Sequence, residues 1–373
     1  MGSVGLTSVK VVILVPSHWG AQTGGSEFRA HCLADFLVSQ DCEVTYLTRN
    51  PPLSGEQYAY PITAFAPPRA LRRLRWGFAP DSVSLFRALN ALNPDVIIQL
   101  VACAHTGVAA YWAKRHNKLM FWYLASDMDV EKSPNIGVNG PARILDGLLF
   151  RYGRENCSHI VCQTRFQKHR LLETTGRSAV AVIPNFHPAP QHAVEAESVF
   201  TAVWVANFKP LKQPQVFLQL AEDLRHENIK FCMIGRLENS TWGKSIRQKI
   251  QQQTNVEFMG EMDMDSVNRQ IGASHVLVNT SEYEGFPNTF IQAWMRGVPT
   301  LSLNVDPDGV IEANGLGKKT GDYENIRHEL LSLKNDVNQY DEASRRCMDF
   351  AKTNHSMQNA SQLLTLIQRE LDG

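Results

Sequence analysis

The stretch His275–Trp294, which reads HVLVNTSEYEGFPNTFIQAW, carries the clearest local signal of fold in the chain. The apolar run His275–Val278 predicts a buried strand, and a turn that contains Gly285 and Pro287 follows it. A helix is expected to begin near Asn288, because Pro287 closes the turn and the residues after it are amphipathic. A buried strand that leads through a tight turn into a helix is the repeating unit of a parallel sheet.

The same alternation of apolar runs and amphipathic segments continues through most of the 373 residues. Continuous apolar strands separated by helices indicate parallel sheets that are covered on both faces. Helical patterns occupy Phe28–Leu37, Pro214–Leu224, Ser266–Ile271 and Asn288–Arg296. Strands are expected at Val11–Pro16, Glu43–Thr48, Asp95–Leu100, Leu119–Leu124, His159–Gln163, Ala179–Ile183, Thr201–Ala206, Ile229–Ile234, Val256–Met259, His275–Val278 and Thr300–Leu303.

The segment Phe186–Ser198 interrupts this pattern with prolines, histidines and small polar residues. Because the chain is too long for one ordinary core, we expect two domains that meet here. The first α/β domain is expected over residues 1–188 and the second over 199–350, with a C-terminal helix over 351–373 that could return to the first. Two doubly wound sheets would face a cleft at the carboxyl ends of their strands, where such folds bind ligands.

The composition excludes several classes of protein. With 43% hydrophobic and 20% charged residues the chain is globular, and its formal net charge of zero argues against a global attraction to nucleic acid. No apolar run reaches membrane-spanning length. The seven cysteines are odd in number and lack the spacing of a disulfide framework or a zinc site. These features predict a cytoplasmic location.

Two loops that follow expected strands have the composition of ligand-binding loops. In Thr23-Gly24-Gly25-Ser26-Glu27 the paired glycines let the backbone pass close to a ligand, and the helix behind them offers N–H groups to an anion. Ser26 is the expected N-cap of that helix. A flexible turn without a ligand is the alternative interpretation.

The second loop is Ser281–Thr289, and its helix start would suit a pyrophosphate. Glu284 lies just before that helix, so its carboxylate could reach sugar hydroxyls beside the phosphate. Gln292 lies one turn after Asn288, so both side chains are expected to address one ligand. Helix capping alone would explain the asparagine and Thr289, but it leaves the glutamate, glycine and proline unexplained.

The order Glu284-Gly285-Phe286-Pro287 before a helix resembles the donor-site motif of retaining glycosyltransferase family 4, which has the GT-B fold. Gly24-Gly25-Ser26-Glu27 is similar to the family's first-loop Gly-Gly-x-Glu, and Val182-Ile183-Pro184-Asn185 to its Val-x-Pro-Asn. Val203–Lys212 resembles the first strand and phosphate-binding loop of the second domain. The resemblance covers nearly the whole chain. It implies an acceptor-side Rossmann-like domain followed by one that binds a nucleotide sugar.

The resemblance also implies roles for the matched residues. Glu284 would hold hydroxyls of the donor sugar, and Lys212 would neutralise charge on the departing diphosphate. Gly25 would let its backbone approach that phosphate, and Gly260-Glu261-Met262 would lie beside the nucleobase. The nucleotide sugar is the substrate, and no cofactor or metal is implied, because the cation and the helix start stabilise the leaving group. The implied donor-binding set is Gly24, Gly25, Asn207, Met262, Gly285, Phe286, Pro287, Asn288, Thr289 and Gln292.

The sequence departs from the family pattern at two donor-site positions. Gln292 replaces a glutamate that usually grips the ribose, so the contact loses its charge assistance. Asn207 stands where an arginine often precedes the lysine, and Lys209 or Lys212 could supply the missing cation as a point charge.

A third departure concerns activation of the acceptor. Many relatives have a histidine after the strand that matches Leu119–Leu124, but here the chain reads Ala125-Ser126-Asp127-Met128-Asp129. Activation could therefore rest on Asp127, on Ser126 or on the donor phosphate itself. His105 is a further candidate. For this histidine, and for His18 and His31, a purely structural role is the favoured alternative. The two aspartates could suggest a metal, but carboxylates in one loop more often bond backbone amides.

The segment Pro67–Phe78 contains four arginines among apolar side chains. The candidate patch consists of Arg69, Arg72, Arg73, Arg75 and Trp76. Docking on an anionic membrane near a lipid-linked acceptor is one interpretation. A solvated surface helix or an arginine-lined acceptor groove is the other. RNA binding is disfavoured because the patch is isolated in a neutral chain.

Together these features predict a metal-independent, hexosyltransferase-type enzyme that moves a sugar from a nucleotide sugar to an acceptor hydroxyl with retention. The expected acceptor is a lipid-linked or polysaccharide-precursor glycan, reached in the cytoplasm or at the inner face of the membrane. The alternative is a non-catalytic GT-B protein that partners an active transferase, which the substituted motif positions motivate. A GT-B epimerase finds no support in the Glu-Gly-Phe-Pro turn.

Overall fold

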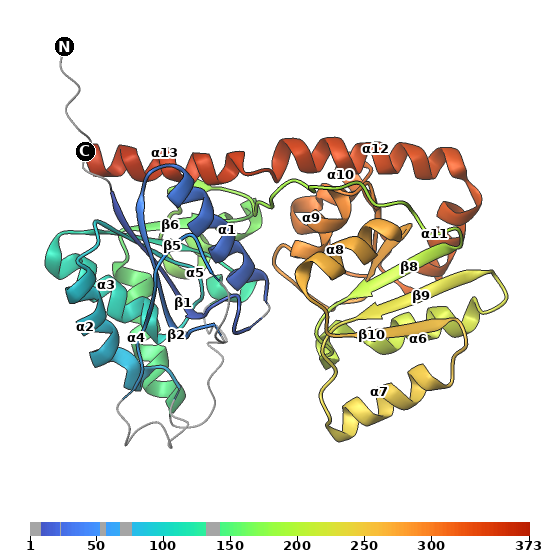
Figure 1. The fold of residues 1–373 in the computed structure, drawn as a ribbon, viewed down its shortest axis with the longest axis horizontal. Coiled ribbons are helices and arrows are strands. Elements are labelled where there is room, and N and C mark those ends of the chain that lie inside the picture. Colours follow the sequence, from blue (N-terminus) through green and yellow to red (C-terminus); the bar gives the residue numbers. More distant parts are fainter. Residues whose placement is uncertain (1–8, 23, 53–56, 68–76, 132–141) are drawn as a thin grey trace, which may run out of the picture. The chain divides into compact units, whose positions relative to one another are not determined.

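The computed structural model describes residues 9–22, 24–52, 57–67, 77–131 and 142–373. The chain forms two compact units, one from residues up to Phe186 with Met357–Gly373, the other from His187–Ser356. Each unit contains one parallel sheet with helices packed against it (Figure 1). The arginine-rich candidates Arg69, Arg72, Arg73, Arg75 and Trp76 lie outside the described residues, as does Thr23.

The sheet of the first unit has the strand order β3-β2-β1-β4-β5-β6-β7. Its strands are β1 (Lys10–Ser17), β2 (Glu43–Asn50), β3 (Ile62–Ala64), β4 (Val96–Gln99), β5 (Leu119–Tyr123), β6 (His159–Cys162) and β7 (Ala181–Val182). Its helices are α1 (Gly25–Ser39), α2 (Ser82–Leu92), α3 (Ala104–His116), α4 (Ala142–Asn156), α5 (Arg165–Thr175) and α13 (Gln358–Asp372).

Strand β1 is central in this sheet because nearly all of its side chains are apolar and buried. Val12 pairs in parallel register with Thr45 of β2 on one side and with Ile97 of β4 on the other. A strand buried on both faces loses its alternation of polar and apolar residues, which is why the run is continuous in the sequence. Helices α2, α3 and α4 lie together over part of this sheet (Figure 1).

The sheet of the second unit has the order β10-β9-β8-β11-β12-β13, again parallel throughout. Its strands are β8 (Phe200–Val205), β9 (Ile229–Ile234), β10 (Val256–Gly260), β11 (Val276–Asn279), β12 (Thr300–Ser302) and β13 (Gly317–Lys319). Its helices are α6 (Pro214–Asp223), α7 (Thr241–Gln251), α8 (Met264–Ala273), α9 (Asn288–Trp294), α10 (Val310–Asn314), α11 (Tyr323–Asn335) and α12 (Val337–Asn354).

The fold class expected from the sequence is confirmed, and every expected strand is present with small shifts at its ends. Two strands were not expected, β3 and β13. Both have three residues, lie at the outer edge of a sheet and leave much of their surface exposed, so they carry no apolar run. Helix α12 continues to Asn354, so position 351, where the sequence suggested a last helix, falls inside it.

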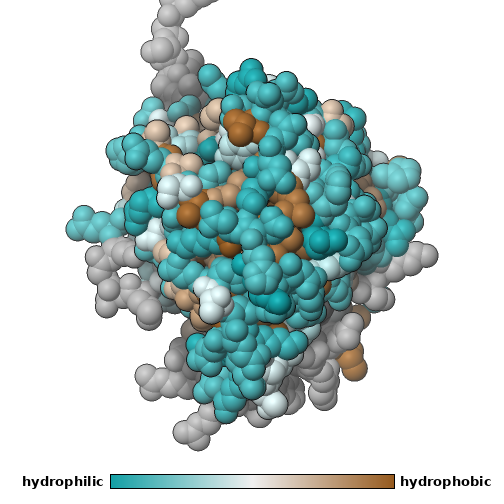
Figure 2. Space-filling model, turned by 90° about the vertical axis from the view of Figure 1, so that its right-hand side faces the viewer, coloured by the Kyte–Doolittle hydropathy of each residue, from teal (hydrophilic) through white to brown (hydrophobic). Residues whose placement is uncertain are grey.

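No helix among the described residues is long and apolar enough to cross a membrane. All seven cysteines are free thiols, and all but Cys42 are buried. The face of the molecule drawn in Figure 2 is mostly hydrophilic, with small hydrophobic areas between polar side chains. Isolated apolar residues of this kind are normal at a protein surface and need no partner.

Candidate active site

The strand order of the second unit reverses between β8 and β11, which are neighbours in the sheet although β9 and β10 intervene in the chain. In a doubly wound sheet, ligands bind beside such a reversal at the carboxyl ends of the strands. Two loops meet there, residues 206–213 after β8 and residues 280–287 after β11. They carry Lys212 and Glu284, two of the residues to which the family resemblance assigns roles in this unit.

Glu284 and Lys212 form an ion pair, with Nζ of the lysine 2.8 Å from Oε2 of the glutamate. The other carboxylate oxygen, Oε1, accepts hydrogen bonds from Nδ2 of Asn279 at 2.9 Å and from Oγ of Ser281 at 2.6 Å. Both charged side chains are about four-fifths buried, at 18% exposure for Glu284 and 20% for Lys212. The carboxylate therefore has a fixed orientation and still reaches the surface.

The two loops are tied together below this pair. The hydroxyl of Thr280 donates to the carbonyl of Lys212 at 2.6 Å and accepts from the indole N–H of Trp204 at 2.9 Å. The amide of Glu282 donates to the carbonyl of Leu211 at 2.9 Å. These bonds join β8, β11 and the 3₁₀ turn Pro210–Lys212, so the cation is held by its backbone as well as by Glu284.

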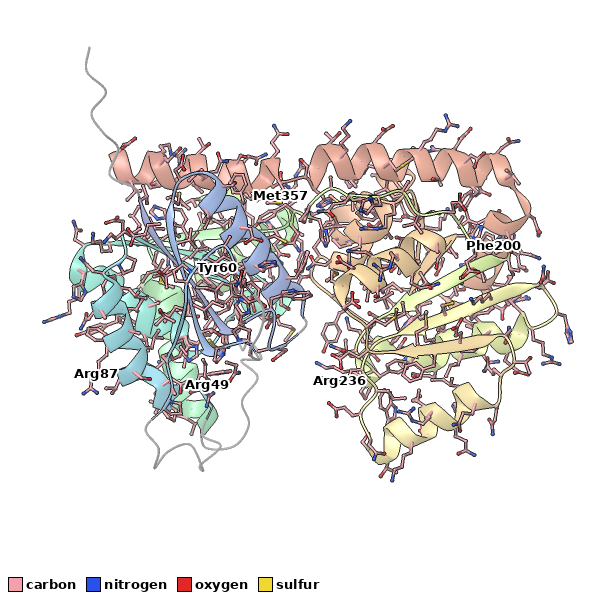
Figure 3. All side chains as sticks on the ribbon, viewed as in Figure 1. Arg49, Tyr60, Arg87, Phe200, Arg236 and Met357 are labelled. Atoms are coloured by element: carbon pink, nitrogen blue, oxygen red, sulfur yellow. The ribbon has the colours of Figure 1, made fainter. Side chains whose placement is uncertain are left out.

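The loops after β8, β9 and β10 lie next to these two loops, at the same carboxyl ends of the strands. Asn207 Oδ1 accepts from the amide of Arg236 at 3.3 Å, and the amide of Gly235 donates to the carbonyl of Gly260 at 2.8 Å. Gly235 has φ of 142°, and a Cβ on it would lie 1.9 Å from the carbonyl oxygen of Ala206, so the loops can approach this closely only at a glycine. Arg236 is exposed at this edge (Figure 3).

Arg236 is a cation that the sequence reasoning missed. It stands beside Asn207, the position where the family often has an arginine, although it lies 29 residues later in the chain. The order Ile234-Gly235-Arg236 at the end of a strand could have drawn attention to it. Asn279, Ser281 and Thr280 were missed as well, because they look like ordinary loop residues until their partners are known.

Gln292 differs from the expectation that it shares an open face with Asn288. Its side chain is 2% exposed, and its Nε2 donates to Oδ1 of Asn268 on α8 at 2.8 Å. An amide can reach this partner without the cost of burying a charge, which explains why an uncharged residue is tolerated there. With 2% of its surface exposed, Gln292 offers little area for contact with a ribose in this conformation.

The turn residues of the Glu-Gly-Phe-Pro motif divide into two kinds. Phe286 and Pro287 are buried, and the ring of Phe286 packs against Trp294 and His355 at centroid distances of 6.0 and 4.7 Å. These residues shape the turn from inside. Gly285, Asn288 and Thr289 are half-buried. Met262 is a partly buried residue that packs against the apolar cluster to which Phe286 belongs. Helix α9 spans seven residues, so its dipole is short.

In the first unit, Gly24 is the N-cap of α1 and Ser26 lies in the first turn, so the expectation that Ser26 caps the helix is wrong. The carboxylate of Glu27 folds back over Gly24, where an added Cβ would lie 2.3 Å from its Oε2. A larger residue at the cap would therefore require the Glu27 side chain to move. Burial raises the pKa of the Glu27 carboxyl, against a backbone hydrogen bond that lowers it.

The Val-x-Pro-Asn segment of the first unit is held by a buried arginine that the sequence did not reveal. Arg29 donates from Nη1 to Oδ1 of Asn185 at 2.6 Å and from Nη2 to the carbonyl of Leu124 at 2.9 Å. Its guanidinium also lies over the ring of Tyr123 at 4.2 Å. Arg29 thus fixes the ends of β5 and β7 to α1, which is a structural role.

The polar side chains of the acidic loop after β5 all take part in hydrogen bonds within the first unit. Asp129 is 5% exposed, and its Oδ2 accepts from the amides of Ala125 and Ser126 at 2.8 and 3.0 Å. Ser126 Oγ accepts from the amide of Met128, and Asp127 Oδ1 accepts from Nε2 of Gln167 at 2.9 Å. Burial raises the pKa of Asp129 to about 6, although the two amides favour its ionised form.

Of the candidate histidines of the first unit, His18 and His105 are buried, whereas the side chain of His31 is 22% exposed and lies 3.4 Å from Asp35. His105 is fully buried, and its Nε2 lies 3.0 Å from Oδ2 of Asp81. Burial opposes its charged form, but Cys103 and Asp81 outweigh this and raise its pKa to about 9. His18 and His31 both contact the hydroxyl of Tyr60, at 3.1 and 2.8 Å. His105 has no surface with which to reach an acceptor, so the structural alternative holds for it.

Comparison with known proteins follows the same division of the chain. Residues 23–188 match the family model described as Glycosyltransferase Family 4. Residues 189–357 match the model described as Glycosyl transferases group 1. The chain belongs to glycosyltransferase family 4. Within this glycosyltransferase, Lys212 and Glu284 both lie in the segment that matches the group 1 model.

Solved structures agree with this family's fold over nearly the full length. HepE of Anabaena in complex with UDP aligns with a TM-score of 0.75 at 12% identity, covering 97% of this chain and 100% of that one. Sucrose-phosphate synthase of Thermosynechococcus elongatus aligns at 0.76 with 12% identity, covering 98% and 99%. WaaG, a glycosyltransferase involved in lipopolysaccharide biosynthesis, aligns at 0.74 with 12% identity, covering 96% and 99%. No curated protein sequence matches the chain.

Proposed function

We propose that this glycosyltransferase moves a hexosyl residue from a nucleotide sugar to an acceptor hydroxyl with retention, and that it needs no metal. The Lys212–Glu284 pair at the strand-order reversal of the second unit is the observation that carries this proposal. A carboxylate and an ammonium at such an edge offer complementary partners to the two halves of a nucleotide sugar, its sugar hydroxyls and its diphosphate.

Glu284 has the capacity to hold a sugar. A carboxylate offers about four acceptor positions, and among the described residues three donors contact this one: Asn279, Ser281 and Lys212. Oε2 takes only the lysine of these three, so it can still accept from a donor-sugar hydroxyl. Because hydrogen bonds from Asn279 and Ser281 already fix the orientation of the carboxylate, sugar binding would cost little side-chain entropy.

Lys212 would act on the leaving group. When the bond between the anomeric carbon and the diphosphate breaks, negative charge collects on the phosphate oxygens, and a fixed ammonium stabilises that charge. The acceptor oxygen forms the new bond to the anomeric carbon, and its proton passes to the departing phosphate. Arg236, exposed at the same sheet edge, would add the cation that Asn207 does not supply.

Two of the related structures suggest where to begin with substrates. HepE was crystallised with UDP and with UDP-glucose, so uridine nucleotides come first among donors. WaaG takes part in lipopolysaccharide biosynthesis, which fits the lipid-linked or polysaccharide-precursor glycan that we propose as acceptor. Ser126 accepts from an amide of its own loop and Asp127 accepts from Gln167 of α5, so the donor phosphate is the proposed base.

The test begins with thermal shifts of the full chain against UDP, GDP and ADP sugars, since a ligand at 100 times its Kd stabilises a fold by about 2.7 kcal/mol. The best donor is then assayed for transfer to a pool of lipid-linked glycans, with and without EDTA, and the product anomer is assigned by NMR. We expect transfer, retention and no effect of EDTA. Donor binding without turnover across the pool would instead support the non-catalytic partner.

A further inference from the structure

An apolar groove of about 680 Å³ lies on the first unit between α2, α3 and α4, in a region that the donor chemistry does not use. Its walls are mainly hydrophobic and aromatic side chains, with Ser82, Arg87 and Asn90 as its polar members. Those that matter here are Val83, Phe86, Val108, Tyr111, Leu149 and Tyr152. A contiguous apolar surface of this kind differs from the scattered apolar residues of Figure 2, and it marks an interaction site.

The groove exists because two glycines bring α3 and α4 into backbone contact. A Cβ on Gly107 would lie 2.0 Å from the carbonyl oxygen of Leu149, and one on Gly153 would lie 2.5 Å from the carbonyl carbon of Thr106. Gly107 itself lines the groove, so no side chain fills the space above that contact. The concavity is thus fixed by rigid helices, which favours a preformed site over one created by a mobile loop.

Aromatic rings form a continuous run across the three helices. Phe86 of α2 lies 6.0 Å from Tyr111 of α3, and Tyr111 lies 6.4 Å from Tyr152 of α4, measured between ring centroids. Tyr111 is 48% exposed. Tyrosines combine an apolar ring with a polar hydroxyl, a combination that suits the boundary between water and hydrocarbon.

Aliphatic side chains extend this surface along α4. Ile144, Leu145 and Leu148 are exposed by 71%, 51% and 48% of their surface. Their spacing places Leu145 above Leu149 and Ile144 above Leu148 on the helix. Val83 of α2 adds a fourth exposed aliphatic residue at the groove. Leaving this many large aliphatic groups in water is unfavourable, because apolar surface is stabilised when it is removed from water.

Basic side chains accompany the apolar ones on the same helices. Arg87 lines the groove and projects from the outer side of α2 (Figure 3), and Lys114, Arg115 and Arg151 are exposed on α3 and α4. Among the described exposed residues of these helices, Glu155 is the acidic one. The face is therefore cationic in a chain whose overall charge is zero.

We propose that this face of the first unit docks on the surface of an anionic lipid bilayer, with the α4 aliphatic residues inserted and an acyl chain seated in the groove. Aliphatic insertion, boundary tyrosines and flanking cations together match the chemistry of a bilayer interface. A protein partner would leave the local excess of positive charge unexplained. The proposal concerns location and is independent of the sugar-transfer chemistry.

The test is sedimentation of the full chain with phosphatidylcholine vesicles, with and without phosphatidylglycerol. We expect binding that requires the anionic lipid and weakens with salt. The double change Ile144→Asp with Leu148→Asp should lower the bound fraction at least tenfold, and Arg87→Glu with Arg151→Glu should lower the affinity about fivefold or more per charge reversed. Val337→Asp with Lys352→Glu, at exposed sites on α12, is the matched control and should leave binding unchanged.

Insertion is measured separately with Tyr111→Trp, whose fluorescence should be quenched by lipids brominated on their acyl chains more than that of the unsubstituted protein. Circular dichroism and melting confirm that each variant folds. The two double variants, at Ile144 with Leu148 and at Arg87 with Arg151, are called the groove variants. Equal vesicle binding by these variants and the unsubstituted protein would overturn the proposal, and so would failure of the protein to bind anionic vesicles. Sugar transfer to a water-soluble acceptor should persist in the groove variants, so failure of this proposal is distinguishable from failure of the catalytic one.

Discussion

Two acidic loops occupy comparable places in the two units, yet they have opposite relations to their own chain. Ser126–Asp129 follows β5 in the first unit, and Ser281–Glu284 follows β11 in the second. Asp129 is buried and accepts two backbone amides of its own loop. Glu284 is held by side chains and by Lys212, and it still reaches the surface.

The difference follows from sheet order as well as from local sequence. Strand β5 lies between β4 and β6 in a regular succession, where no reversal opens a crevice beside its loop. Strand β11 adjoins β8 across the reversal, so a loop that arrived much earlier in the chain supplies a cation to it. In these two loops, the carboxylate that reaches the surface is held by side chains, one of them from another loop, whereas the buried carboxylate is held by backbone amides of its own loop.

The most severe test of this comparison is Glu284→Gln. The change keeps the shape but removes the charge that pairs with Lys212 and accepts from the sugar, and hydrogen bonds to charged groups contribute about 1.5–3 kcal/mol each. We expect kcat/KM to fall about a hundredfold or more. Steady-state transfer with the best donor measures it.

Two further amide substitutions calibrate that result. Glu282→Gln alters an exposed carboxylate in the same loop and should leave kcat/KM within about threefold. Asp127→Asn makes the same exchange in the loop of the first unit, and the amide oxygen can still accept from Gln167. A large loss of turnover in a well-folded Asp127→Asn protein would return Asp127 to the reaction as a base.

The next largest effect is expected from Lys212→Ala. Because the cation stabilises charge that develops as the diphosphate leaves, kcat should fall about tenfold to a hundredfold while the Kd for the donor changes less. Lys209→Ala removes an exposed lysine from the same segment and is the matched control. Equal losses in kcat and in donor affinity would show that Lys212 contributes to binding alone.

In the first unit, Asp129→Ala should affect stability and spare the donor site. The change leaves the buried amides of Ala125 and Ser126 without their acceptor, at a cost of about 2 kcal/mol in the free energy of unfolding. Chemical denaturation measures this loss, and titration with the donor nucleotide should give an unchanged Kd. An unchanged denaturation midpoint would show that the loop does not depend on Asp129.

The smallest expected effect is a difference between the two units in how their stability depends on pH. Burial, with Arg296 nearby, lowers the pKa of His187 in the second unit to about 3, so the stability it contributes is present above 6.5 and lost as the pH falls. The pKa of His105 in the first unit is about 9, so its contribution is full below 6.5 and lost as the pH rises. Between pH 7 and 6 the second unit should lose about 0.7 kcal/mol, and between pH 7 and 8 the first about 1 kcal/mol.

Hydrogen exchange resolved by peptide measures both changes in one protein. We expect protection to fall first in peptides of residues 187–356 on the acid side and in peptides of residues 77–131 on the alkaline side. His105→Gln should flatten the alkaline change. The same order of protection loss on both sides would contradict this assignment of the two histidines.

Most of the fold was predictable because buried parallel strands leave continuous apolar runs, as Val11–Pro16 and Phe231–Ile234 do. The edge strands β3 and β13 were not predictable, since three half-exposed residues make no such run. Ser26 was assigned as a cap by its residue type, but α1 begins at Gly25 and Gly24 takes the cap position, which only the folded structure shows.

The site was predictable in part for a similar reason. The family motif singled out Glu284 and Lys212, yet their pairing joins residues 72 positions apart and depends on the order of strands in the sheet. Asn279, Ser281 and Arg236 carried no motif of their own. Gln292 was expected on an open face because helical spacing gives a direction, whereas its burial depends on Asn268 of another helix.

The short outer strands have a consequence for the protein at high concentration. A sheet edge with unpaired N–H and C=O groups is a template on which a second chain can add a strand. Three of the four outer strands, β3, β7 and β13, have two or three residues each, and Lys318 and Lys319 stand exposed on β13, whereas the fourth, β10, has five residues. At these three edges too little backbone is offered for stable strand addition, and the lysines of β13 repel a like edge. Edge-to-edge association in a crowded cell should therefore be limited to β10, the longest of the four outer strands.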